Sequence, residues 1–150
     1  ASGAVENLGT LQGAYHRVGN KADLALDPTR GRLYMNTAGV SAFDLETGQD
    51  LGPVDPINQT GDVWDIAVDH KTGTVYTLGD QAKVKRYDPT TQSVTDLGTM
   101  QLPSGAGFDG AIDDLALDRA NAVLYGSSGR GHFELGQLDL ETGQSQPVPI

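Results

Sequence analysis

The stretch DLALDPTRGRLY, residues 23–34, contains the pattern that decides the fold. It returns as DIAVDHKTGTVY at residues 65–76 and as DLALDRANAVLY at residues 114–125. The first aspartates of the three copies are 42 and 49 residues apart, and the final tyrosines keep the same two intervals. Because two separate markers share one spacing, we infer an internal repeat of about 40–50 residues, the length of a four-stranded unit.

Each copy predicts four short strands joined by tight turns. The first strand alternates aliphatic residues with alanine, and the second ends in an aliphatic–tyrosine pair. The third ends in FDLETG (43–48), YDPTTQ (87–92) or LDLETG (138–143), which predicts another turn before the fourth strand. Aspartate accepts hydrogen bonds from the amides of a turn, and glycine supplies its positive φ. Asp27, Asp69 and Asp118, which close the first strands, are therefore predicted turn caps.

The composition favours the same fold class. Glycine, at 20 of 150 residues, has about twice its usual frequency of about 7%. No window of useful length has the i, i+3, i+4, i+7 apolar spacing of an amphipathic helix. The predicted class is all-β.

The pattern Asp-h-Ala-h-Asp-x-x-x-Gly-x-h-Tyr (h, aliphatic), followed by Asp-x-x-Thr-Gly, resembles the NHL, YVTN and YWTD-type β-propeller repeats. The resemblance covers nearly the whole chain. It implies a propeller segment of about three four-stranded antiparallel blades, at residues of about 20–57, 62–102 and 108–150. The third copy departs from the pattern where Asn121-Ala122 replaces Thr-Gly. We expect Asn121 to accept the left-handed backbone there, because asparagine tolerates it.

The frame of the repeat is offset by one strand. VENLGT (5–10) is similar to VTDLGT (94–99), which predicts an outer strand of a preceding blade at residues 4–12. Three blades do not close a ring of the usual four to eight. Two alternatives are open: further sequence completes a six-bladed ring, or a second copy completes it as a homodimer. The last predicted strand contains Pro147 and Pro149 and belongs at a sheet edge, because proline cannot donate to a ladder.

Charge and cysteine content narrow the classes of partner. The net charge of −10, with ten scattered Lys and Arg, disfavours nucleic acid. No apolar run approaches about 20 residues, so no membrane insertion is predicted. The absence of cysteine excludes disulfides and thiolate metal sites. The small-residue start ASGA (1–4) is typical of a chain cut by signal peptidase, which predicts an extracellular or periplasmic protein.

The repeated aspartates are the first candidate site residues. The first strand of a propeller blade is innermost, so the resemblance places Asp23, Asp65 and Asp114 near the central channel. Further acidic residues precede these strands: Asp62, Asp109 and Asp113. Together they could bind Ca²⁺, which takes six to eight oxygen ligands, although no cofactor is required. Alternatively, each repeated aspartate accepts backbone hydrogen bonds from the neighbouring blade and so maintains the repeat.

Trp64 is the only tryptophan and has no aromatic counterpart in the other copies. It is either a stacking platform for a sugar or a packing residue. The primary prediction is a non-catalytic binding or scaffold module that presents its loops and channel face to a protein or saccharide. The alternative is a hydrolase or lyase of the lactonase or glycosidase kind at the channel mouth, with a dependence on Ca²⁺. No Ser-His-Asp or H-E-x-x-H constellation selects catalytic residues.

Overall fold

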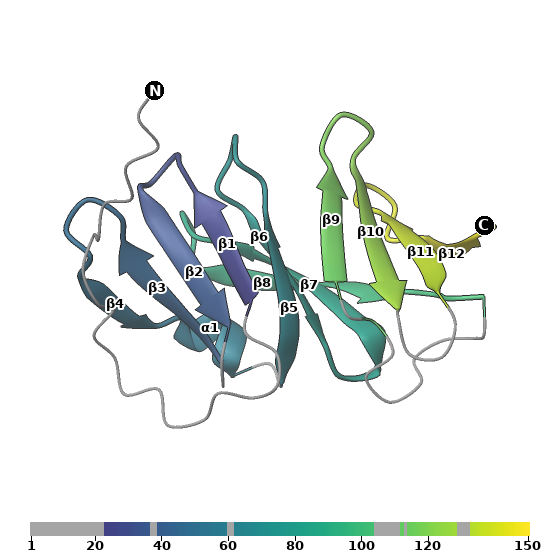
Figure 1. Cartoon of the computed structure of the whole chain (residues 1–150), viewed down its shortest axis with the longest axis horizontal. Helices are drawn as coiled ribbons and strands as arrows, with labels where there is room; N and C mark the ends of the chain where they lie inside the picture. The colour runs from purple at the N-terminus through teal and green to yellow at the C-terminus, as the bar shows by residue number, and fades with distance from the viewer. Residues whose placement is uncertain (1–22, 37–38, 60–61, 104–111, 113, 129–132) are drawn as a thin grey trace, which may run out of the picture.

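The computed structural model describes residues 23–36, 39–59, 62–103, 112, 114–128 and 133–150. It is all-β, with three four-stranded antiparallel sheets, which confirms the predicted class and the four strands of each copy (Figure 1). In each sheet, strands that follow one another in sequence are hydrogen-bonded neighbours. The predicted outer strand at residues 4–12 lies outside the described residues.

The strands follow the repeat. Sheet 1 contains β1 (Asp23–Asp27), β2 (Arg32–Asn36), β3 (Val40–Asp44) and β4 (Asp50–Pro53). Sheet 2 contains β5 (Val63–Val68), β6 (Val75–Gly79), β7 (Lys83–Asp88) and β8 (Ser93–Thr99). Sheet 3 contains β9 (Asp114–Asp118), β10 (Val123–Ser128), β11 (Glu134–Asp139) and β12 (Ser145–Val148). The strand β12, with Pro147, is at the edge of its sheet, as predicted.

Two single helical turns were not predicted. They are α1 (Asp55–Asn58) and a 3₁₀ turn (Asp80–Ala82), and both are too short to produce an apolar period. No helix in the described part of the chain is long and apolar enough to cross a membrane.

The turn after each first strand is capped as predicted. In each turn, a carboxylate oxygen of the aspartate accepts a hydrogen bond from the backbone amide of the residue two positions later in the sequence. The donor amides are those of Thr29 to Asp27 at 3.0 Å, Lys71 to Asp69 at 2.8 Å and Ala120 to Asp118 at 3.0 Å. In the third turn, however, it is Ala122 (φ 52°) and not Asn121 that takes the left-handed backbone. Asn121 instead donates from its side chain to Asp118 at 2.7 Å. The expectation for Asn121 was therefore wrong by one position.

The sheets pack face to face, with sheet 2 in the middle. One apolar cluster joins residues of sheets 1 and 2, and a second joins residues of sheets 2 and 3. The connections between sheets add to both, with Ile57 of α1 in the first cluster and Met100 and Leu102 in the second. The first strands lie side by side, β1 against β5 and β5 against β9 (Figure 1).

A pair of glycines makes room for the chain that leaves sheet 2. Gly126 and Gly136 are opposite one another on β10 and β11. A Cβ on Gly126 would lie 2.2 Å from the sulfur of Met100, and a Cβ on Gly136 would lie 2.2 Å from the carbonyl oxygen of Gln101. Only glycine permits this approach, which buries Met100 completely.

Candidate functional site

Two of the repeated aspartates connect one sheet to the next. Asp23, at the start of β1, accepts a hydrogen bond of 3.2 Å from the backbone amide of Ile66 in sheet 2. Asp65, in β5, accepts a short hydrogen bond from the backbone amide of Leu115 in sheet 3. In both cases the donor directly follows the repeated aspartate of the next sheet: Ile66 follows Asp65, and Leu115 follows Asp114. The geometry of Asp23 and Asp65 thus matches the second predicted role, in which the aspartate joins neighbouring units.

The carboxyl group of Asp65 is in an environment that favours its neutral form. Asp65 is 4% exposed. Burial, the hydrogen bond with Asp23 and the negative charge of Asp23 raise the pKa of Asp65 to about 8, against the lowering effect of the Ile66 and Leu115 amides. At neutral pH we therefore expect Asp65 to keep its proton and to donate it to Asp23. Amide, acid and carboxylate then form one hydrogen-bonded chain across all three sheets.

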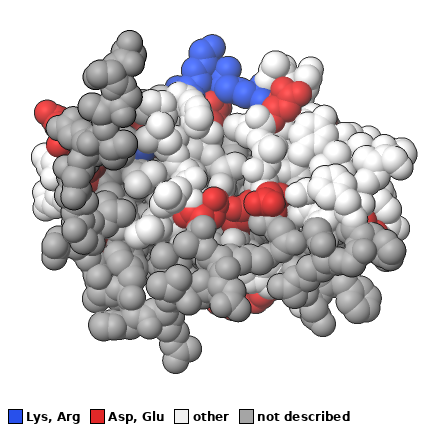
Figure 2. Space-filling view, viewed as in Figure 1, with Lys and Arg blue, Asp and Glu red and all other residues white. Residues whose placement is uncertain are grey.

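The other predicted acidic residues are placed differently. Asp114 begins β9 and is exposed, and Asp62 precedes β5 and is also exposed. Asp109 and Asp113 lie outside the described residues. Figure 2 shows acidic side chains gathered across the middle of one face of the molecule. Even so, no three His, Asp or Glu side chains of the described residues are grouped as metal ligands.

Trp64 is located at a β-bulge. The ladder between β5 and β6 shifts from Val63 opposite Gly79 to Asp65 opposite Leu78, which leaves Trp64 with no residue opposite it. A bulge turns the strand and redirects its side chains, so this one sets the direction of Trp64. Trp64 is half-buried, and its role as a stacking platform stays a prediction.

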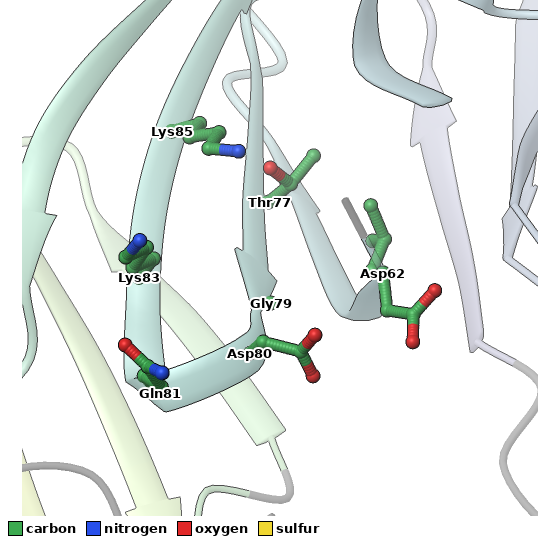
Figure 3. Close-up of a pocket in the computed structure, with 8 residues that line it drawn as sticks. Asp62, Thr77, Gly79, Asp80, Gln81, Lys83 and Lys85 are labelled. Atoms are coloured by element: carbon green, nitrogen blue, oxygen red, sulfur yellow. The ribbon is translucent and has the colours of Figure 1, made fainter. Parts of the chain in front are cut away.

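A polar pocket of about 230 Å³ lies beside the hairpin that joins β6 and β7. Its lining comprises Asp62, Val63, Thr77, Gly79, Asp80, Gln81, Lys83 and Lys85 (Figure 3). Figure 3 shows the side chain of Lys85 reaching toward Thr77, and the carboxylates of Asp62 and Asp80 pointing to the same side of the hairpin. The pocket therefore presents hydrogen-bond donors and acceptors together, with two residues of each charge.

The hairpin beside the pocket has an unusual backbone. Gln81 and Ala82 both have positive φ, at 58° and 56°. Two such residues in succession are typical of a type I′ turn, where Asn-Gly is preferred. The amide of Met100 donates to the carbonyl of Ala82 at 2.9 Å and helps to hold this conformation. Left-handed backbone at non-glycine residues stores strain.

Sequence reasoning missed this pocket because its residues come from separate segments and form no motif. One signal was present. Lys83 and Lys85 alternate with the buried Val84, and the same face of β7 continues to the buried Tyr87. Two lysines on a face that is otherwise packed against sheet 1 indicate a local opening in that packing.

Comparison of the chain with protein-family models gave no match, and comparison with curated proteins gave none either. The function is therefore inferred from the geometry.

Proposed function

We propose that the three sheets are consecutive blades of a β-propeller and that the chain is a non-catalytic binding or scaffold module. The observation that carries this proposal is the repeated bond from an aspartate of one first strand to the amide of the next. It occurs twice with the same register, and β1, β5 and β9 lie side by side as inner strands of adjacent blades would. The NHL, YVTN and YWTD-type repeat pattern supports the same proposal.

The scaffold role agrees with how Asp23 and Asp65 are used. Their carboxyl oxygens accept backbone amides, and Asp65 is almost inaccessible to a ligand. A protonated Asp65 also has little attraction for Ca²⁺, which binds ionised carboxylates. We therefore assign these residues to the cohesion of the blades. Calcium binding and an extracellular or periplasmic location stay predictions from the sequence.

The polar pocket of sheet 2 is the proposed contact for a partner. Its volume of about 230 Å³ is below the roughly 300–1,000 Å³ of drug-sized sites, and fits one sugar unit or one side chain of a protein. Paired donors and acceptors suit the hydroxyl groups of a saccharide, which need both. Lys83, Lys85 and the two carboxylates would form those hydrogen bonds.

This proposal is tested by calorimetric titration of the protein with a panel of mono- and oligosaccharides. We expect a sugar that binds the wild type to lose at least tenfold in affinity for Lys83→Met combined with Lys85→Met. Lys71→Met is the matched control, because Lys71 is an exposed lysine that does not line this pocket. No binding by any sugar, or equal binding by all three proteins, would remove the pocket as a saccharide site.

One observation favours an enzyme as a second candidate. A carboxyl group with a pKa of about 8, as in Asp65, is protonated at neutral pH, as a general acid is, and a substrate would have to reach this side chain, which is 4% exposed. The candidate is a hydrolase or lyase acting on lactones or glycosides. Turnover of any member of such a panel, with or without Ca²⁺, that disappears in Asp65→Asn and persists in Asp114→Asn would replace the scaffold proposal.

A further inference from the structure

The outer face of sheet 1, called here the leading face, exposes residues that the repeat buries elsewhere. Leu24 and Leu26 of β1 hold the positions of Ile66 and Val68 of β5. Ile66 and Val68 are 4% and 7% exposed and pack in the cluster shared with sheet 1. Leu24 and Leu26 are 57% and 42% exposed. The leading face thus has the apolar residues of an inter-sheet contact, but none of the described residues forms a sheet that covers them.

The outer face of sheet 3, called the trailing face, is the opposite half of the same contact. Tyr34 and Tyr76, on the faces of sheets 1 and 2 that pack against the following sheet, are 0% and 7% exposed. The equivalent Tyr125 of β10 is only partly buried, and Ala116 beside it is exposed. Both residues would be covered if a further sheet followed sheet 3.

The repeated aspartate gives the two faces a specific match. Asp23 accepts the amide of Ile66, and Asp65 accepts the amide of Leu115. Asp114 is the next acceptor in this series, and it is exposed at the end of the stack. In sheet 1, Leu24 holds the position that Ile66 holds in sheet 2 and Leu115 holds in sheet 3, so its amide is the equivalent donor. The trailing face therefore offers the acceptor, and the leading face offers the donor.

We propose that a second copy of this chain covers both faces, so that the leading face of each copy packs on the trailing face of the other and Asp114 accepts the amide of Leu24 from that copy. The inference rests on the proposed propeller. It commits to a second copy because each open face is one half of a contact that the chain already makes twice. Two such contacts related by a two-fold axis close a ring of six sheets, within the usual four to eight.

Disulfide trapping tests the pairing directly, because the chain contains no cysteine of its own. Separate preparations of Leu24→Cys and Asp114→Cys are mixed under mild oxidation and separated on a non-reducing gel. We expect a covalent dimer in the mixture and far less in either preparation alone, because the contact joins unlike faces. Wild-type protein should have twice the 15.8 kDa chain mass by light scattering.

The matched control is a single chain with Asp65→Cys and Leu115→Cys, which are in contact inside the molecule. If this internal disulfide forms while the mixture gives none, or gives one only between identical variants, the second copy is excluded and the blade packing is kept. If the internal disulfide also fails, the proposed packing of the sheets is wrong, and both proposals fall with it. A wild-type protein that is folded but monomeric at high concentration likewise overturns the second copy alone.

Discussion

Sheet 2 is packed on both faces, whereas sheets 1 and 3 each combine one packed face with one open face. Every residue of β6 is buried, while β1 exposes Leu24 and Leu26 and no residue of β9 is fully buried. The strands β1 and β9 have the same sequence, DLALD, which is similar to the repeated part of β5. Burial therefore depends on the neighbouring sheet and not on the residues of the strand itself, as in other repeat proteins.

Ile66 and Leu24 hold equivalent positions on a packed face and on an open face. Ile66→Ala removes side-chain atoms from a packed contact, so we expect the free energy of unfolding to fall by about 2–4 kcal/mol. Leu24→Ala removes an exposed side chain and should cost less than about 1 kcal/mol when the protein is dilute enough to be monomeric. Denaturant titration measures both. Equal losses would contradict the difference between inner and outer faces.

A second difference concerns Asp65 and Asp114. The folded protein keeps the Asp65 proton up to a pKa of about 8, whereas the unfolded chain releases it near pH 4. Between these values the unfolded state binds fewer protons, so the free energy of unfolding should fall as pH rises, by up to about 1.4 kcal/mol per pH unit. Below pH 4 this contribution is fully present. Urea titrations at pH 5, 6, 7 and 8 measure the slope.

Asp65→Asn keeps the shape of the neutral acid and should flatten this slope, and Asp114→Asn, at an exposed position, is the matched control. The turn cap Asp118 does not interfere. Hydrogen bonds from the side chain and amide of Asn121 lower the pKa of Asp118, so its effect on stability falls below this pH range. An Asp65→Asn variant with the wild-type slope would show that Asp65 is ionised in the folded protein.

The first turns of sheets 1 and 2 differ in what surrounds their glycine. Gly31 and Gly73 both have positive φ, at 61° and 72°. A Cβ on Gly31 meets nothing within 4 Å, whereas one on Gly73 would lie 1.7 Å from a guanidinium nitrogen of Arg30. That nitrogen donates to the carbonyl of Thr72 at 2.7 Å and so connects the two sheets.

We expect Gly31→Ala to cost about 1 kcal/mol of stability from backbone strain alone. Gly73→Ala should cost roughly 1 kcal/mol more, because it also displaces Arg30 from Thr72. Thermal and denaturant unfolding of the two variants give the difference. A Gly73→Ala variant no less stable than Gly31→Ala would mean that Arg30 does not connect these turns.

The smallest expected effect is a gain in stability. Gln92 (φ 56°) holds the place of Gly48 and Gly143, and Ala122 (φ 52°) holds the place of Gly31. Replacing either by glycine relieves left-handed strain, offset in part by the greater entropy of the unfolded chain. We expect Gln92→Gly and Ala122→Gly each to add about 0.5 kcal/mol, measured as a shift in denaturation midpoint. A loss in both would show that these turns are unstrained.

The sequence alone predicts the features whose causes are local. The alternation in DLALD and the Asp and Gly of the turns determine strands and caps within a few residues, so the three sheets and the roles of Asp27, Asp69 and Asp118 could be predicted. Each cap accepts the amide of the residue two positions later in its own turn, and only Asp69 among them is also bound by Arg119 of the first turn of sheet 3. The resemblance to propeller repeats extends this local pattern to an architecture.

The remaining features depend on residues far apart in sequence. The raised pKa of Asp65 depends first on its burial between the sheets and then on Asp23, 42 residues before it. The pocket requires Asp62 to meet the hairpin at Gln81, and the exposure of Leu24 requires knowing which sheets are adjacent. The bulge at Trp64 depends on how β5 pairs with β6, which the residues around Trp64 do not indicate by themselves.

The central claim is that a repeated aspartate joins each sheet to the next. It is tested most directly by an NMR titration that follows the carboxyl carbon of Asp65 and the amide of Leu115 between pH 4 and pH 10. We predict that the carboxyl carbon titrates with a pKa near 8 and that the Leu115 amide shifts with the same midpoint, because the two groups share a hydrogen bond. A Leu115 amide that does not shift when Asp65 titrates would contradict the claim.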